Sequence, residues 1–118
     1  MGAVVRSIKD ALGADGAAPI MAERARVSFN GTGTVAIRAA KNVLGVTDLG
    51  VGFYRVNFEV HMPDDEYVAP LASGGSGSIA VAYLRGATPK NVAYVDVGIG
   101  VPGVGSSDSE FVEVVVSR

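Results

Sequence analysis

Apolar and polar residues alternate along most of the chain after residue 21, in short runs separated by glycine-rich turns. The run 53–60 is the clearest, because Tyr54, Val56, Phe58 and Val60 fall on one side and more polar residues fall between them. Alternation with a period of two is typical of a half-buried β-strand. We therefore expect Tyr54 and Phe58 to lie in a hydrophobic core.

Similar runs predict further strands at residues 21–29, 34–39, 42–47, 67–72, 79–84, 92–99 and 111–116. About seven or eight short strands with no helix between them are typical of an antiparallel sandwich or a small barrel. A parallel sheet would need crossover helices, which this pattern lacks. The predicted fold is all-β: an antiparallel β-sandwich of about seven or eight short strands.

Residues 3–12 have a different pattern from the rest of the chain. Four apolar residues recur there at helical spacing, and they are Val4, Val5, Ile8 and Leu12. This spacing predicts a short amphipathic helix, which is too short to be stable alone and must pack on a partner. We interpret residues 1–20 as an N-terminal helix and linker for docking or oligomerisation, followed by a β-sandwich domain at 21–118. The alternative is a helix that packs on its own domain or frays as a tail.

Two glycine- and serine-rich stretches predict exposed loops, at residues 73–77 and 100–109. Loops carry binding functions more often than the strands they connect. The candidate contact residues in these loops are Gly75, Ser76, Ser106, Ser107 and Asp108. Because they lack apolar anchors, we expect alanine at the last three positions to change stability by no more than about 0.5 kcal/mol.

Composition excludes several classes of partner. The chain has 118 residues, 48% of them apolar, and a net charge of -2. This length suits one domain, and the absence of a basic stripe argues against nucleic acid as a partner. No apolar run approaches the ~18 residues that suggest a membrane span, so we expect no membrane insertion. The start of the chain lacks the features of a signal peptide, which predicts synthesis in the cytoplasm without secretory export.

Catalytic and metal-binding chemistry is poorly represented in the sequence. There is no cysteine, and His61 is the single histidine. A zinc site or a catalytic triad would need more such groups, so we expect no catalytic residue, no metal and no cofactor. The G-x-G-x-x-G match at 98–103 contains Pro102 and no following helix pattern, and we interpret it as chance. The acidic run 64–66 is interpreted as a solvated turn.

A set of turn residues and aromatics has a more specific order. It comprises Phe29-Asn30-Gly31-Thr32-Gly33-Thr34, Ile37-Arg38, Asn42-Val43, Thr47-Asp48, Gly50, Gly52, Tyr54, Val56-Asn57-Phe58, Met62-Pro63-Asp64 and Tyr67. In this order the segment 27–69 resembles a module that recurs in structural proteins of tailed bacteriophages. The resemblance is looser over the rest of the chain, and it brings no catalytic or binding residues with it.

The resemblance implies a virion structural protein, most simply a short tail fibre or tail-tip subunit that contacts a host receptor such as a surface glycan. Such modules are commonly homotrimers, so the implied partners are other copies of the chain and, through the N-terminus, other virion proteins. The family module usually ends a longer fibre chain, whereas this chain has 118 residues. A capsid decoration or head fibre protein is therefore an alternative.

A stand-alone carbohydrate-binding lectin is a further alternative. It predicts an exposed tyrosine beside polar loop residues, because sugars stack on aromatic rings. Tyrosine has a polar tip and often reaches the surface, and Tyr83 and Tyr94 are the candidates for such a position.

Overall fold

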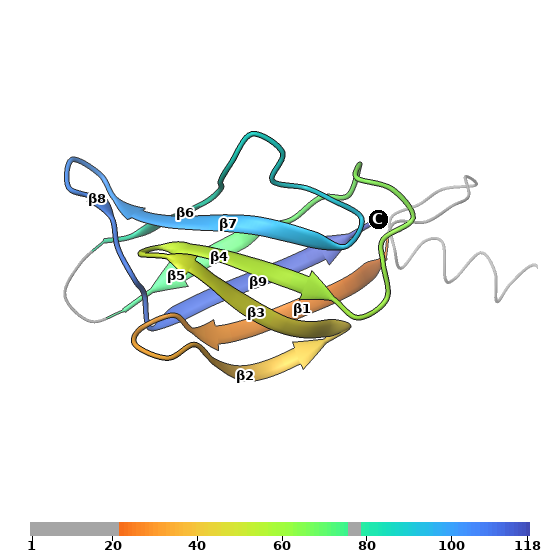
Figure 1. Cartoon of the computed structure of the whole chain (residues 1–118), viewed down its shortest axis with the longest axis horizontal. Coiled ribbons are helices and arrows are strands. Elements are labelled where there is room, and N and C mark those ends of the chain that lie inside the picture. The colour runs from red at the N-terminus through yellow and green to blue at the C-terminus, as the bar shows by residue number, and fades with distance from the viewer. Residues whose placement is uncertain (1–21, 76–78) are drawn as a thin grey trace, which may run out of the picture.

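The computed structural model describes residues 22–75 and 79–118, which form two antiparallel β-sheets packed face to face (Figure 1). The all-β, antiparallel architecture predicted from the sequence is thereby confirmed. The predicted N-terminal helix and linker lie outside the described residues. In the described ranges there is no helix of the length and apolar character needed to cross a membrane.

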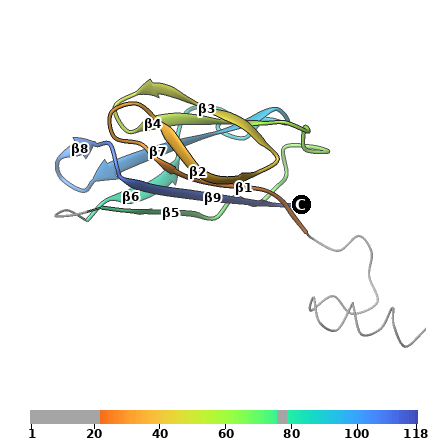
Figure 2. The same ribbon diagram turned by 90° about the horizontal axis from the view of Figure 1, so that it is seen from below.

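Nine strands occur within the described ranges. They are β1 (Glu23–Asn30), β2 (Ala36–Lys41), β3 (Val43–Gly50), β4 (Phe53–Phe58), β5 (Leu71–Gly74), β6 (Val81–Leu84), β7 (Tyr94–Val101), β8 (Gly105–Ser106) and β9 (Phe111–Ser117). The four-stranded sheet has the order β2-β1-β9-β5, and the five-stranded sheet has the order β3-β4-β7-β6 with β8 paired to β7. Figure 2 shows the two layers from the side.

The core lies between the four central strands, each of which contributes three inward side chains. They are Ala25, Val27 and Phe29 from β1, Tyr54, Val56 and Phe58 from β4, Val95, Val97 and Ile99 from β7, and Val112, Val114 and Val116 from β9. Phe29 and Tyr54 meet edge to face across the sheets, with ring centroids 5.2 Å apart. The predicted burial of Tyr54 and Phe58 is correct, and such aromatic pairs stabilise a core beyond their buried area.

Asn42 is the point where the chain crosses from one sheet to the other. It joins β2 to β3 with a φ of 54°, a left-handed conformation that asparagine tolerates better than most residues. Its side-chain amide donates to the carbonyls of Arg24 and Val60, at 3.1 and 3.0 Å, and its oxygen accepts from the Val60 amide at 2.6 Å. One side chain thus holds together the start of β1, the crossing and the end of β4.

The chain after β4 is fixed by a buried tyrosine and an ion pair. The Tyr67 hydroxyl accepts from the Asn91 amide at 3.0 Å and lies 2.8 Å from the Tyr94 carbonyl. Burial raises the pKa of Tyr67 to about 12. The Arg118 guanidinium binds both carboxylate oxygens of Asp64 at 2.8 Å and lowers the pKa of Asp64 to about 2. Asp64 therefore holds the segment after β4 to the last residue of the chain, and its carboxylate is not free in a solvated turn.

Three local expectations differ from the structure. Val60 is 69% exposed, because β4 ends at Phe58 and Asn42 turns the chain outward. The predicted strand 67–72 becomes regular only at Leu71, since Pro70 has no amide proton for the ladder. The predicted loop 100–109 contains a hairpin in which Gly100 pairs with Ser106 and Val101 with Gly105.

We expect Asn42→Gly to destabilise the protein by about 1–2 kcal/mol, because it keeps the backbone conformation and removes three hydrogen bonds. Asn42→Ala should cost about 1 kcal/mol more, because alanine also strains the left-handed backbone. Urea denaturation measures both changes. Leu44→Ala, at a side chain that is 75% exposed on β3, is the control and should stay near the wild-type value. Equal losses for the glycine and alanine variants would contradict the backbone argument.

The Asp64–Arg118 pair predicts a pH dependence of stability. The folded-state pKa of Asp64 is lowered to about 2, below the value of roughly 3.9 for an unfolded aspartate. A lowered pKa stabilises the fold above the unfolded value, and this stabilisation is lost as the pH falls toward 2. Asp64→Asn should therefore lower the melting temperature at neutral pH and lose this effect in acid. Asp65→Asn, at the exposed neighbouring carboxylate, is the control and should keep the wild-type melting temperature at neutral pH.

Candidate functional site

Five connections gather at the end of the sandwich where β1 ends and β9 begins (Figure 1). They are the β1–β2 loop, the β3–β4 turn, the β5–β6 connection, the β7–β8 hairpin and the segment from β8 to β9. Of the predicted contact residues, Gly75, Ser106, Ser107 and Asp108 lie at this end. Ser76 lies outside the described residues, as do Val4, Val5, Ile8 and Leu12. We refer to this region as the loop end.

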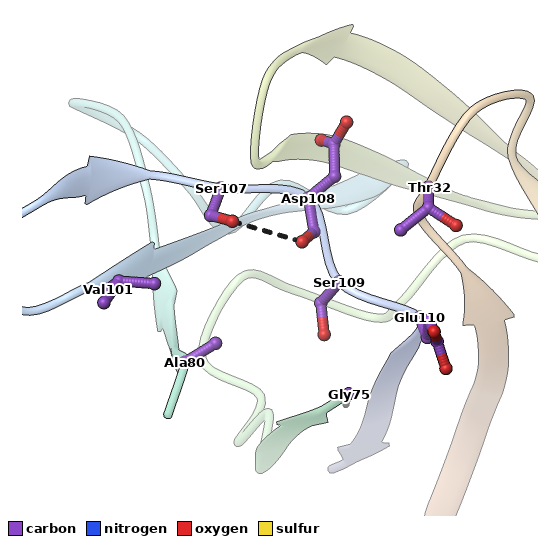
Figure 3. A pocket seen from close by; sticks show the side chains of 8 residues that line it. All are labelled: Thr32, Gly75, Ala80, Val101, Ser107, Asp108, Ser109 and Glu110. Carbon is purple, nitrogen blue, oxygen red and sulfur yellow. Dashed lines mark hydrogen bonds between the residues drawn. The ribbon is translucent and has the colours of Figure 1, made fainter. Parts of the chain in front are cut away.

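A shallow hollow of about 190 Å³ opens at the loop end (Figure 3). Its walls come from four of the connections, and the lining residues are Thr32, Gly75, Ala80, Val101, Ser107, Asp108, Ser109 and Glu110. Hydroxyl groups and backbone atoms make up much of this wall. The hollow thus brings together three of the predicted contact residues, whereas Ser106 lies on the hairpin beside it.

Asp108 has a structural role that the sequence does not reveal. Its Oδ1 accepts from the Gly52 amide at 2.9 Å and lies 2.8 Å from the Tyr54 hydroxyl. The same hydroxyl lies 2.8 Å from the Gly31 carbonyl. Burial and the neighbouring Asp108 carboxylate raise the pKa of Tyr54 above its ordinary value, so Tyr54 stays a neutral donor. In Figure 3 the Asp108 carboxylate points away from Ala80 and Ser109.

Two glycines make this arrangement possible. Gly31 is buried, and a methyl group there would overlap the Tyr54 hydroxyl. Gly52 has a φ of 61°, and a methyl group there would lie 2.7 Å from the Ser107 carbonyl. Both positions therefore require glycine, one for space and the other for space and backbone conformation.

Ser109 ties the hollow to two connections of the four-stranded sheet, one after β1 and one at the end of β5. Its side chain is 5% exposed, and its hydroxyl donates to the Gly74 carbonyl at 2.6 Å. Its carbonyl accepts from the Gly31 amide at 2.8 Å. The segment 107–110 is thus pinned at Ser109 and Asp108, and the side chains left for contact are those of Thr32, Ser107 and Glu110. Asp108 is exposed, but its Oδ1 already binds the Gly52 amide and the Tyr54 hydroxyl, so we expect alanine to cost more there than at Ser106 or Ser107.

The hollow lacks the geometry of a nucleophile and its base. The Ser107 hydroxyl donates to the carbonyl of Asp108 at 3.3 Å, not to its carboxylate. β4 ends at the opposite end of the sandwich (Figure 1), and His61 follows it in the chain and is exposed. Within residues 22–75 and 79–118, no cluster of three or more histidine, cysteine or acidic side chains could hold a metal ion.

The glycine motif at 98–103 also takes a structural role. Gly98 and Gly100 belong to β7, and Gly103 lies in the hairpin that follows, with a φ of 80°. No helix follows the motif, so it does not form a phosphate-binding turn. Its residues instead pair with β6 and β8 in the sheet.

Comparison of the chain with protein-family models, curated protein sequences and solved structures finds no match. The resemblance of residues 27–69 to a bacteriophage module therefore stays a hypothesis based on the order of the residues themselves.

Sequence reasoning missed the partners of the buried polar groups. The alternation around Tyr54 indicates that its ring is buried, and a buried hydroxyl needs a partner. Nothing in that pattern identifies Asp108, which is 54 residues away. The same holds for the Asp96 carboxylate, which is 6% exposed and accepts from Arg55 at 2.8 and 3.0 Å.

We expect Asp108→Ala to destabilise the protein by about 1–2 kcal/mol, because the buried Gly52 amide then loses its acceptor. Ser106→Ala removes an exposed hydroxyl from the neighbouring strand and should stay within about 0.5 kcal/mol of wild type. Chemical denaturation of the two variants provides the comparison. A loss for Asp108→Ala as small as that for Ser106→Ala would mean that water replaces the carboxylate at no cost.

Proposed function

We propose that this protein is a structural subunit of a tailed-bacteriophage virion, of the short tail fibre or tail-tip kind. It assembles as a homotrimer, docks to other virion proteins through its N-terminal segment, and presents the loop end outward to a host surface. It acts by binding and not by catalysis, and it needs no cofactor.

The observation that carries this proposal is the shared role of the residues in the resemblance. Gly31 gives the Tyr54 hydroxyl its space, Asn42 makes the crossing between sheets, and Gly52 allows the tight turn before β4. Met62 and Tyr67 are buried in the core. The pattern therefore follows the positions that determine the path of the chain, as expected for a recurring structural module.

The ionic groups support a structural protein. Three carboxylates with well-defined partners are each engaged in holding the fold: Asp64 with Arg118, Asp96 with Arg55, and Asp108 with the Gly52 amide. A catalytic carboxylate instead has to face a substrate within reach of the reacting atom. These three carboxylates are used to fix the backbone and the sheet surface.

The form of the chain supports assembly from several copies. The apolar stripe at Val4, Val5, Ile8 and Leu12 precedes β1, which begins at the end of the sandwich opposite the loop end (Figure 1). In the assembly that we propose, this stripe packs against its copies around a threefold axis. The loop end then lies away from the attachment point, where a contact surface is useful.

The test is the mass of the full chain in solution by light scattering, compared with the chain lacking residues 1–20. We expect a trimer for the full chain, and a monomer that keeps the sandwich for the truncated chain, because the apolar stripe provides the assembly contacts. Far-ultraviolet circular dichroism checks that the sheets are retained.

Two full-length variants make the test specific. Serine at Val4, Val5, Ile8 and Leu12 should give a monomer, whereas glutamine at Arg6 and Lys9 should leave the trimer intact. A monomeric full chain, or a truncated chain that still forms a trimer, would contradict the proposed assembly.

A further inference from the structure

A second hollow, of about 350 Å³, lies on the outer face of the five-stranded sheet, beside the β7–β8 hairpin. We call it the outer groove, and its lining residues are Val81, Tyr83, Gly100, Val101, Pro102, Gly105 and Ser106. Val101 lines both hollows, so the hairpin forms a ridge between the outer groove and the loop-end hollow. The groove is shallow and wide open to solvent, so it suits a small ligand that lies flat on the surface.

The groove depends on which side chains of β6 face outward. Ala80 and Ala82 pack against the core, while Val81 and Tyr83 face outward and are 47% and 40% exposed. The sheets come close at this edge, because the Ser73 hydroxyl of β5 donates to the Ala80 carbonyl at 3.0 Å. At Ala80 and Ala82 small side chains suit this close approach, and Val81 and Tyr83 are left on the outer face.

The Tyr83 ring is held in place by the backbone of β7. A Cβ atom added at Gly98 would lie 2.7 Å from Cζ and 2.8 Å from Cε2 of the ring, so the ring covers the place where a side chain would stand. Gly100 lies beside it, with the corresponding distance to Cε1 at 3.7 Å. The ring therefore packs on a flat glycine surface with one side, and the exposed part of the residue faces the solvent.

Polar groups stand beside this ring. The Arg85 guanidinium lies 4.4 Å above the centroid of the Phe53 ring, and its Nη1 is 3.3 Å from the Ser106 hydroxyl. Nη1 also donates to the Gly52 carbonyl at 3.3 Å, which holds the guanidinium in position. The Ser106 hydroxyl itself is exposed and lines the groove. An apolar ring surface thus has hydroxyl and guanidinium groups at its rim.

The other three tyrosines of the chain are covered. Tyr54 and Tyr67 are buried in the core, and the Tyr94 ring lies 3.9 Å below the Arg55 guanidinium. Tyr83 is therefore the tyrosine whose ring is available to a ligand. This is the exposed tyrosine beside a polar loop residue that carbohydrate binding predicts.

We propose that the outer groove binds a pyranose sugar, with one face of the sugar ring stacked on Tyr83. A pyranose has C–H groups on a face and hydroxyls around its edge, which matches an aromatic surface with polar groups at its rim. The stacked face is desolvated against Tyr83 and Val81, and the edge hydroxyls bond to Ser106 and Arg85.

A purely apolar ligand fits this surface less well. It would remove the polar groups of the rim from water and offer them no hydrogen bonds in return. The sugar site adds a ligand class and a second binding surface to the proposed host contact, and it rests on the proposed function only for the source of the sugar. It concerns the outer face of the sheet, whereas the loop-end hollow lies on the other side of the hairpin.

The test is a nuclear magnetic resonance titration of the full, uniformly ¹⁵N-labelled chain with methyl β-D-galactopyranoside, methyl β-D-glucopyranoside and methyl α-L-rhamnopyranoside. We expect at least one of these probes to cause saturable shifts of amides around the groove, at Tyr83, Gly98, Gly100 and Gly105. Glycerol, which has hydroxyls and no ring face, should cause no saturable shift.

Substitutions then test the stacking. Tyr83→Ala should weaken binding by about tenfold or more, whereas Tyr83→Phe keeps the ring and should stay within about threefold. Val81→Glu places a charge in the groove at an exposed position and should also abolish binding. Leu44→Ala, on the strand at the far edge of the same sheet, is the matched control and should bind as wild type.

Three results would overturn the site: no saturable shift with any of the sugars, shifts confined to another surface, or unchanged binding by Tyr83→Ala and Val81→Glu. The dispersion of the amide spectrum shows whether each variant is folded. The proposed sugar site and the proposed assembly can be refuted independently of each other. A monomer that binds sugar keeps the site and refutes the trimer, and a trimer that binds none of the sugars does the reverse.

Discussion

The loop end depends on the hydroxyl of Tyr54. Its ring lies in the core against Phe29, while its oxygen lies 2.8 Å from both the Gly31 carbonyl and the Asp108 carboxylate. One side chain therefore connects the packing between the sheets to the β1–β2 loop and to the segment that leads into β9. Because a buried polar group without a partner is costly, these contacts fix one arrangement of the loops. The loop-end hollow is built on that arrangement.

The two ends of the sandwich are closed in different ways. At the loop end, the contacts join backbone groups to a tyrosine and a carboxylate that lie far apart in the sequence. At the other end, Asn42 holds the crossing, Tyr67 reaches the chain before β7, and Arg118 binds Asp64. These contacts hold the chain where the two sheets are joined. Between the ends, the strands are held by apolar packing and by the Arg55–Asp96 pair of β4 and β7.

Much of the fold could be predicted from the alternation of apolar and polar residues. This alternation is clear in β1, β4 and β9, where buried side chains alternate with more exposed ones. The pattern does not say which face of β6 is inward. There the larger residues, Val81 and Tyr83, lie outside, while the small Ala80 and Ala82 pack against the core. The site was harder to predict, since the partners of Tyr54 and Arg55 are set by tertiary pairing across 54 and 41 residues.

The β7–β8 hairpin ends in a tip at residues 102–104 that projects beyond the core (Figure 1). The base of the hairpin is fixed by its ladder pairs and by Asp108, whereas Val104 at the tip is 81% exposed. Lengthening a surface loop adds little closure entropy, because that cost grows only slowly with length. The tip is therefore a place where peptide insertions can be accepted without a loss of folding. Variation at this one turn would reshape the wall of the outer groove, which Pro102 lines, while the sheets that support it stay the same.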